Sequence, residues 1–316
     1  MEILMLSAAD VRAVTTMPRA IAAMRRGMEA LFRGEIDAPL RSPISQPAGV
    51  SLFMPAASMD SVGIKIVSVF GDNPKNRLPV INGVYVLVDH ETGVPVAVMD
   101  AIYMTALRTG ATAGLATDLL APPDAAVLTI FGAGGQAQAL IDGAQAVRPI
   151  EEIRVVSKGG SSAQRLAAQQ ATSSAAFVDA RKALDGADIV ITATPSTEPL
   201  FATAMLKSPV HISAIGSYSL EMRELPADCF ADADVVVEHR ASAIAESGEI
   251  NDALDQKVIG PDVLIELGAL IAGEARLAGH RRTIFKSMGH AAQDIAIADE
   301  IYRAAKAQGI GTTVAL

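Results

Sequence analysis

The glycine-rich stretch at residues 132–137 constrains the fold more than any other part of the sequence. Gly132, Gly134 and Ala137 form the pattern G-x-G-x-x-A, between the apolar run AAVLTIF and a helix-like segment that includes AQALIDGAQAV. Small residues at this spacing allow a tight turn, close approach of the backbone to a pyrophosphate, and close packing of a helix on a strand. The pattern therefore predicts a dinucleotide-binding strand–loop–helix unit. The alternative interpretation is a tight turn in an α/β fold that binds nothing.

The segments after this loop alternate between apolar strands and helices. The predicted strands are IRVVS, AFV, DIVITATP, HISAIG and DVVVE. Such alternation is typical of a parallel, doubly wound sheet. Half of the residues are apolar but only 4% are aromatic, so the core must be built from Ala, Val, Ile and Leu. We therefore predict a doubly wound, nucleotide-binding domain of the α/β class at residues 118–290.

The rest of the chain has a different pattern. Residues 8–34 show apolar positions at helical spacing, with Gly34 as the predicted end of the helix. Short apolar runs separated by Pro, Gly and Asp-Asn follow, and DHETG between two of them predicts a hairpin turn in a partly antiparallel sheet. The segment TALRTGATAGLATDLL predicts an Ala-rich helix, and a last helix follows residue 290. A chain of 316 residues suits two domains, so we predict a mixed α+β domain at residues 1–117, to which the last helix, in residues 291–316, returns to pack.

Charge and cysteine content narrow the class of partner. A net charge of −9 and scattered Lys and Arg residues argue against nucleic acid or an anionic membrane as the partner. Cys229 is the single cysteine, so an internal disulfide is excluded and a reducing compartment is favoured. We find no apolar run of about 18 residues and no metal-ligand or hydrolase spacing. We therefore expect a soluble, cytoplasmic protein that acts on a small molecule and needs no metal.

The end of the second predicted strand of this domain bears on which dinucleotide is bound. A site selective for NAD usually has Asp or Glu there, whereas this chain has Ser157 and Lys158. A hydroxyl and a cation suit a 2′-phosphate, so NADP(H) is preferred and NAD(H) remains possible. The alternative for Lys158 is an ordinary solvated loop lysine. The residues assigned to the cofactor are Gly132, Ala133, Gly134, Gly135, Gln136, Ala137, Ser157, Lys158 and Ser217.

Ser217 belongs to a second strand end, in the segment VHISAIGSYS. The carboxyl ends of parallel strands face the ligand in open α/β sheets. Gly216 would let the backbone come close to the ligand, and Ser217 and Tyr218 would line the site with hydroxyl groups. The alternative is a strand-to-loop turn with a half-buried tyrosine.

Three cations occur where their surroundings are apolar or small. Lys65 lies in the apolar run VGIKIVSVF, Arg108 in a helix of small residues, and Arg41 in a Pro-bounded extended segment. Burying an unpaired ammonium costs several kcal/mol, so Lys65 either reaches the surface or is held for a purpose. Arg108 has an alternative role as a structural partner, and Arg41 as a surface residue. Together the three suit the binding of a carboxylate.

The order of several motifs resembles the ornithine cyclodeaminase/mu-crystallin family over nearly the whole chain. The motifs are GIKIV, FGDNP, DHETGVPVAVMD, TALRTGATAGLA, FGAGGQA, GADIVITATPSTEPLF, AIGSYSLEMREL and IFKSMGHAAQDIAIA. The resemblance implies a Rossmann domain inserted into a substrate-binding and dimerisation domain, and a homodimer. It also implies that Arg41, Lys65 and Arg108 line the substrate pocket. Asp294 matches an acidic residue found near the nicotinamide, or else pairs structurally within its helix.

Two departures from the family's pattern separate this chain from true ornithine cyclodeaminases. Those enzymes carry Gly-Asp where this chain has Ser217 and Tyr218, and they have an acidic residue where it has Ser157 and Lys158. The chain is more similar to the reductase members. We predict an NAD(P)H-dependent reductase of a small cyclic imino acid such as pyrroline-2-carboxylate or piperideine-2-carboxylate. Lys65 would be its proton donor, and Arg41, Lys65, Arg108, Tyr218 and Asp294 would contact the substrate.

Three alternatives to this function remain open at the level of the sequence. The first is a 2-oxo acid aminating dehydrogenase of the alanine dehydrogenase type. The second is an ornithine cyclodeaminase. The third is a crystallin-like protein that binds NADPH and a small ligand without turnover.

Overall fold

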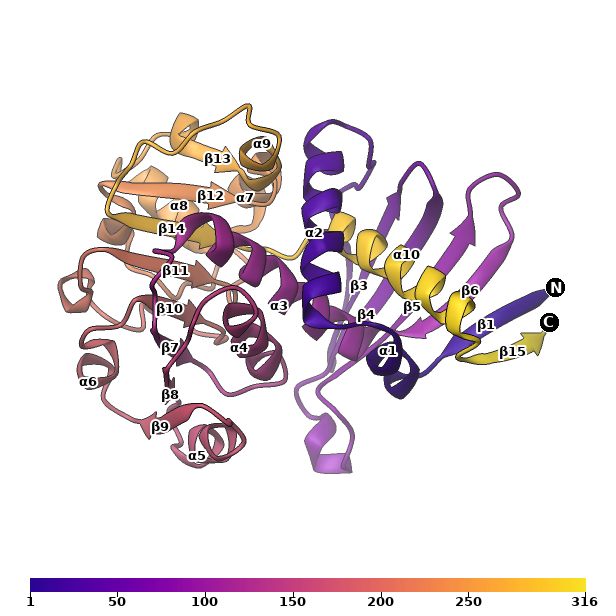
Figure 1. Ribbon diagram of the computed structural model, residues 1–316, viewed down its shortest axis with the longest axis horizontal. Helices are drawn as coiled ribbons and strands as arrows, with labels where there is room; N and C mark the ends of the chain where they lie inside the picture. Colours follow the sequence, from indigo (N-terminus) through magenta and orange to yellow (C-terminus); the bar gives the residue numbers. More distant parts are fainter. The chain divides into compact units, whose positions relative to one another are not determined.

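The computed structural model describes the backbone of residues 1–316 and every side chain except that of Pro74. The chain divides into two compact units, which are described separately below (Figure 1). Unit 1 comprises Met1–Arg108 and His290–Leu316, and unit 2 comprises Thr109–Gly289. The first boundary lies inside helix α3 (Ala101–Leu120), on the N-terminal side of the boundary predicted after residue 117.

Unit 1 contains a seven-stranded mixed sheet with the order β15-β1-β6-β5-β4-β3-β2. The strands are β1 (Glu2–Leu6), β2 (Ser42–Gln46), β3 (Gly49–Ala57), β4 (Ser61–Val69), β5 (Ile81–Asp89), β6 (Pro95–Asp100) and β15 (Thr312–Ala315). Only β1 and β6 pair in parallel, and the other neighbours are antiparallel. The hairpin predicted at DHETG is confirmed: the Asp89 carboxylate accepts bonds from the backbone and hydroxyl of Thr92, and Gly93 has a positive φ of 70°. A short 3₁₀ helix spans Asn73–Asn76.

Helices α1 (Ala8–Val14), α2 (Met17–Phe32) and α10 (Ala291–Gln308) complete unit 1. Helix α10 contacts strands β3, β4 and β5, and α2 lies beside α10 (Figure 1). A Cβ on Gly27 would lie 2.5 Å from the Cβ of Ala296, so glycine lets α2 and α10 approach closely. The single helix predicted over residues 8–34 is two helices, because Pro18 cannot lie inside a continuous helix but is tolerated as the second residue of α2, where its missing N–H breaks no hydrogen bond of the helix.

Unit 2 contains an eight-stranded sheet with the order β13-β12-β14-β11-β10-β7-β8-β9. The strands are β7 (Val127–Phe131), β8 (Glu152–Val156), β9 (Ser173–Phe177), β10 (Ile189–Thr192), β11 (Val210–Ala214), β12 (Ala233–Val237), β13 (Leu264–Glu266) and β14 (Arg282–Lys286). Every neighbouring pair is parallel. Buried Ala, Val, Ile and Leu side chains dominate two separate clusters to which alternate residues of the strands contribute. The predicted doubly wound α/β sheet is confirmed.

Among the described residues, six α-helices lie wholly within unit 2, and one of them, α4, packs unusually closely on the part of α3 that belongs to this unit. The six are α4 (Ala137–Gln145), α5 (Ser161–Ala168), α6 (Ala180–Leu184), α7 (Arg240–Glu246), α8 (Gly248–Asp255) and α9 (Leu267–Ile271), with 3₁₀ helices at Thr203–Met205, Ala227–Phe230 and Pro261–Val263. A Cβ on Gly143 of α4 would lie 2.1 Å from the carbonyl oxygen of Gly110 in α3, and a Cβ on Gly110 would lie 2.1 Å from that of Ala139. Glycine is therefore required where α3 and α4 touch.

The strand order of unit 2 fixes where its sheet can bind a ligand. The chain starts at β7, moves outward through β8 and β9, and then returns to the other side of β7 at β10 (Figure 1). Ligands of such sheets bind beyond the carboxyl ends of the strands, at the point where the strand order reverses. That point is the pair β7 and β10. Among the described residues, no helix is long and apolar enough to cross a membrane.

Candidate functional site

The glycine loop joins β7 to α4 at this reversal point. Gly132 has a φ of 105°, and a Cβ there would lie 2.4 Å from the carbonyl oxygen of Ala193. Both facts require glycine at this turn. A Cβ on Gly134 or Gly135 would meet no described atom within 4 Å beyond its neighbours in the chain, so the loop is open on that side. Gln136 precedes α4 without a side-chain cap on the first turn, which leaves backbone N–H groups that suit a phosphate.

The loop after β8 carries the two residues predicted to choose between NADP(H) and NAD(H). The Ser157 hydroxyl accepts a hydrogen bond of 3.0 Å from the Ser162 hydroxyl. Lys158 is exposed to solvent, and Gly160 has a positive φ of 70° just before α5 begins. A cation and hydroxyl groups therefore stand at the end of the second strand, and no carboxylate occurs between residues 157 and 162.

In unit 1 the structure brings Lys65, Arg108 and Asp294 together. Lys65 is only 1% exposed, and its Nζ lies 2.9 Å from Oδ1 and 2.8 Å from Oδ2 of Asp294. Arg108 Nε lies 3.1 Å from Oδ1 of the same carboxylate, and Arg108 also donates a hydrogen bond to Gln293. Asp294 is fully buried, so one carboxylate serves two buried cations. Two cations against one anion leave this cluster with excess positive charge.

The pKa of Lys65 is lowered, chiefly by burial. Burial lowers the pKa of Lys65 from its ordinary value of 10.5 to about 8, opposed by the Asp294 carboxylate and assisted by the positive charges of Arg108 and Arg41. Arg41 is therefore close enough to Lys65 to act on its charge. A lysine with this pKa holds its proton at neutral pH but gives it up readily, as a general acid must.

Two polar residues of this region were missed by the sequence analysis. Tyr85 lies directly opposite Lys65 on the neighbouring strand and is fully buried. Its hydroxyl lies over Gly63, where a Cβ would come within 2.2 Å of it. Burial raises the pKa of Tyr85 well above its ordinary value, and the charges of Asp294 and Asp299 add to the effect. Gln293, the partner of Arg108, was also missed. The positions of these two residues depend on the register of strand pairing and on the rotation of a helix about its axis, and the local sequence pattern indicates neither.

The strand end at Gly216 differs in detail from the prediction. A Cβ on Gly216 would lie 2.2 Å from the nitrogen and 2.3 Å from the oxygen of Thr194, so the close approach is to the end of β10 and not to a ligand. Ser217 is fully buried and its hydroxyl donates to Glu249 at 2.9 Å, so it does not line a surface as expected. Tyr218 is 41% exposed, as a residue that contacts a ligand requires.

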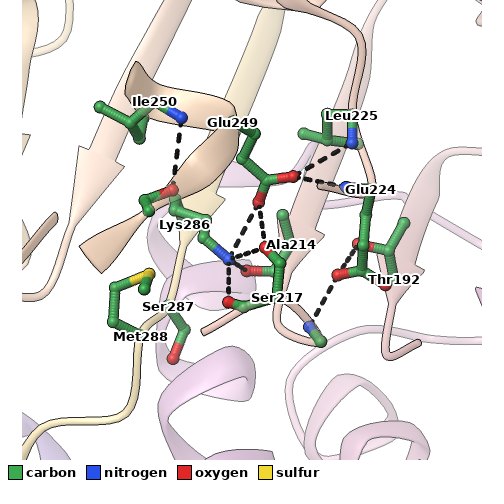
Figure 2. Close-up of polar contacts among 12 residues, drawn as sticks. Thr192, Ala214, Ser217, Glu224, Leu225, Glu249, Ile250, Lys286, Ser287 and Met288 are labelled. Carbon is green, nitrogen blue, oxygen red and sulfur yellow. Dashed lines mark hydrogen bonds and ion pairs between the residues drawn. The ribbon is translucent and has the colours of Figure 1, made fainter. Parts of the chain in front are cut away.

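Behind this strand end lies a buried polar cluster that the sequence analysis missed (Figure 2). Lys286, Glu249 and Glu224 all have 0% exposure. Burial and the charge of Glu249 raise the pKa of Glu224, whereas the charge of Lys286 and backbone hydrogen bonds hold the pKa of Glu249 below its ordinary value. The residues come from segments far apart in the sequence, which is why their pairing had no sequence signal.

Among the described residues, no group of three His, Cys, Asp or Glu side chains is placed to hold a metal ion.

One unit is a parallel, doubly wound sheet with a glycine loop at its reversal point, and the other contains a buried cluster of cations. These features define a two-unit α/β protein of the dinucleotide-binding type. The model of the ornithine cyclodeaminase/mu-crystallin family matches residues 1–309. The chain belongs to this family, as its motifs indicated.

Proteins of this family are similar to the chain over almost its full length. The chain is 33% identical to a Delta(1)-pyrroline-2-carboxylate reductase of Bacillus cereus, over 98% of this chain and 99% of the relative. It superposes with a TM-score of 0.93 on the Thermococcus litoralis Delta(1)-pyrroline-2-carboxylate reductase in complex with NADH and L-proline, at 31% identity over 99% of this chain and 100% of that one. An archaeal alanine dehydrogenase dimer with bound NAD gives a TM-score of 0.92 at 30% identity, over 100% of both chains.

Proposed function

We propose that this chain is an NAD(P)H-dependent reductase of a small cyclic imino acid, which converts pyrroline-2-carboxylate or piperideine-2-carboxylate to proline or pipecolate. The observation that carries the proposal is the Lys65–Asp294–Arg108 cluster, in a chain whose other unit has the glycine loop. The similarity to two Delta(1)-pyrroline-2-carboxylate reductases supports it.

Imine reduction needs a hydride, which a bound nicotinamide dinucleotide supplies. It also needs a group that holds the substrate and a group that donates a proton, and the residues of the cluster suit both tasks. The substrate carboxylate must be held, and a guanidinium binds a carboxylate through two parallel hydrogen bonds. We assign this role to Arg108, with Arg41 assisting. The ring nitrogen must gain a proton as the hydride reaches the imine carbon, and Lys65 with its lowered pKa is assigned as the donor. Asp294 keeps Lys65 protonated at neutral pH.

The test is an NADPH oxidation assay, followed by absorbance, with a panel of cyclic imino acids. We expect turnover of pyrroline-2-carboxylate or piperideine-2-carboxylate, and for Arg108→Ala a KM for the imino acid raised by about 10-fold or more, because a charged hydrogen bond is worth about 1.5 to 3 kcal/mol. Arg26→Ala is the matched control, since Arg26 is a surface arginine paired with Glu300 in the same unit. Tight dinucleotide binding without turnover of any imino acid would contradict the proposal and favour a crystallin-like binder.

A second candidate is an aminating dehydrogenase of the alanine dehydrogenase type, favoured by the similarity to the archaeal enzyme. The same cations would then hold the carboxylate of a 2-oxo acid. The distinguishing measurement is oxidation of NADPH or NADH with pyruvate, with and without ammonia. Ammonia-dependent turnover of pyruvate that exceeds turnover of every cyclic imino acid would replace the first candidate with the second.

A preference for NADP(H) over NAD(H) is part of the proposal. It is supported by Ser157 and the exposed Lys158 at the end of β8, where a carboxylate would repel a 2′-phosphate. We expect Lys158→Ala to raise the KM for NADPH by about 10-fold and leave the KM for NADH unchanged, since about 1.4 kcal/mol corresponds to tenfold. Lys182→Ala, on an exposed lysine of α6, is the control. Equal effects on the two cofactors would argue against this selectivity.

We also propose that the protein is a homodimer. One face of the unit 1 sheet is buried, whereas the row Pro55, Ile64, Val86 and Val98 on the other face is apolar and only partly buried in the single chain. A second copy would cover such a face, and the similar archaeal alanine dehydrogenase is described as a dimer. We expect Ile64→Glu to shift the mass measured by light scattering from dimer to monomer.

We also propose a cytoplasmic location, because the chain has a single cysteine and so no internal disulfide.

A further inference from the structure

The buried cluster of unit 2 lies at the carboxyl ends of three adjacent strands. Lys286 is the last residue of β14, and its neighbour β11 ends just before Gly216 and Ser217. Glu249 comes from α8, and Glu224 follows the loop after Ser217 (Figure 2). The cluster is therefore directly behind the edge of the sheet where a dinucleotide would bind.

Lys286 fixes the backbone and the side chain of Ser217 at the same time. Its Nζ lies 2.7 Å from the carbonyl oxygen and 2.8 Å from the hydroxyl of Ser217, and 2.9 Å from Oε1 of Glu249. The Ser217 hydroxyl in turn donates to Oε1 of Glu249 at 2.9 Å. A fourth acceptor, the carbonyl oxygen of Ala214, lies farther away at 3.4 Å. An ammonium has three N–H donors, so these acceptors leave none of them without a partner.

The two glutamates hold the same strand end from the other side. Oε2 of Glu249 accepts from the backbone nitrogen of Glu224 at 2.8 Å. The Glu224 carboxylate then accepts from the backbone nitrogens of Thr194 and Gly216, each at 2.7 Å. Two buried carboxylates and one ammonium thus tie the ends of β10, β11 and β14 together.

Such a cluster is expensive to bury, and an apolar packing of similar volume is often as stable. What an apolar packing cannot supply is the set of directed hydrogen bonds on Ser217 and Gly216. These bonds define the conformation of the backbone that leads directly to Tyr218, which is 41% exposed. The cluster is therefore better suited to fixing a local geometry than to raising the stability of the fold.

The position of the cluster in the sheet indicates which part of the cofactor it serves. A doubly wound sheet has two mononucleotide-binding halves on either side of the reversal point. The glycine loop and the Ser157–Lys158 loop follow β7 and β8, in one half, whereas Ser217 and Tyr218 follow β11, in the other. If the first half holds the adenosine part, the second half holds the nicotinamide part.

We propose that Lys286, oriented by Glu249, is a positioning residue that fixes Ser217 and so forms the binding surface for the nicotinamide half of the dinucleotide. This inference rests on the proposed function, because it requires a bound nicotinamide dinucleotide. It gives Ser217 an indirect part in cofactor binding, through its conformation and not through an exposed hydroxyl.

The test compares two ligands by isothermal titration calorimetry: NADPH, and 2′-phospho-ADP-ribose, which has the adenosine half but no nicotinamide ring. The variant is the double substitution Lys286→Met with Glu249→Gln, which removes both charges of the ion pair together. Glu224 remains, and its carboxylate keeps the hydrogen bonds from the backbone nitrogens of Thr194 and Gly216. We expect NADPH to bind at least about tenfold more weakly and 2′-phospho-ADP-ribose to bind within about twofold of wild type. Urea unfolding of the same samples reports whether the fold is retained.

The matched control is Lys207→Met, the same substitution in a lysine that pairs with Asp188 just before β10, at the opposite end of the sheet from the cluster. It should leave both affinities unchanged. An equal loss of affinity for both ligands in the double variant, or no loss for either, would overturn the positioning role. If the wild-type protein binds neither ligand, the proposed function fails, and this inference fails with it.

Discussion

Replacing Asp294 with asparagine tests the proposed acid–base role of Lys65 most directly. Asp294→Asn keeps the size of the side chain but removes the negative charge that lies 2.8 to 2.9 Å from Lys65 Nζ. That charge opposes the lowering of the Lys65 pKa, which burial and two neighbouring arginines together bring to about 8. Without Asp294 the pKa of Lys65 must therefore fall further.

The size of the effect follows from the contact. An opposite charge at this distance moves a pKa by about 1 to 3 pH units, so the pKa of Lys65 is expected to fall from about 8 to between about 5 and 7. At pH 7 the protonated fraction of Lys65 then falls from about nine tenths to about half or less. If protonated Lys65 is the proton donor, kcat at pH 7 decreases by about 2-fold to 100-fold and recovers as the pH is lowered.

The assay is steady-state turnover of pyrroline-2-carboxylate with NADPH between pH 5 and pH 10. The wild-type kcat should fall as the pH rises through about 8, and this fall should move to lower pH in Asp294→Asn. Asp299→Asn is the control, since Asp299 lies on the same helix but bonds to Ser61. A kcat profile whose alkaline fall stays at the same pH in Asp294→Asn would refute the assignment of Lys65 as the titrating acid.

Three further predictions concern stability. Gly143→Ala should lower the free energy of unfolding by about 1 to 3 kcal/mol, because the new Cβ would lie 2.1 Å from the Gly110 carbonyl oxygen, whereas Gly260→Ala, in open space, should change the melting temperature little. Because the native pKa of Lys65, about 8, is below the ordinary value of 10.5, the native state binds fewer protons than the unfolded state between these pH values. The contribution of Lys65 to the unfolding free energy should then increase with pH over this window, by up to about 3 kcal/mol; urea unfolding of wild type and Lys65→Met at pH 7.5 and 10 checks the sign. Tyr85→Phe should stabilise the protein by about 1 kcal/mol, since the buried hydroxyl has no hydrogen-bond partner among the residues described, and a lower unfolding free energy would show that it has one.

Much of the fold could be predicted because its signals are local. The turn at Gly132 needs a positive φ and a missing side chain, and both requirements are met by one residue type. The alternation of strands and helices after it likewise follows from short segments, each of which shows its own periodicity. The break in the helix predicted over residues 8–34 was overlooked although it was local, because the helical spacing of apolar residues continues past Pro18.

The candidate site could be predicted only in part. Arg41, Lys65, Arg108 and Asp294 were identified by their motifs, and the structure places them in one electrostatic environment. Tyr85 was overlooked because its position opposite Lys65 depends on the pairing register of two strands. Ser217 was expected at the surface because a strand end alone does not show what packs behind it.

The sequence by itself determined the class of fold, the glycine loop and the identity of the charged residues, since these depend on backbone sterics and on neighbours along the chain. Only the tertiary structure decided which charges meet. Lys65 and Asp294 are separated by 229 positions, and Lys286 and Ser217 by 69. Such pairs form when packed helices and strands bring distant segments together, and burial then removes the solvent that would screen their charges. The same residues would have near-ordinary pKa values in the unfolded chain, so the chemistry proposed for Lys65 arises from folding.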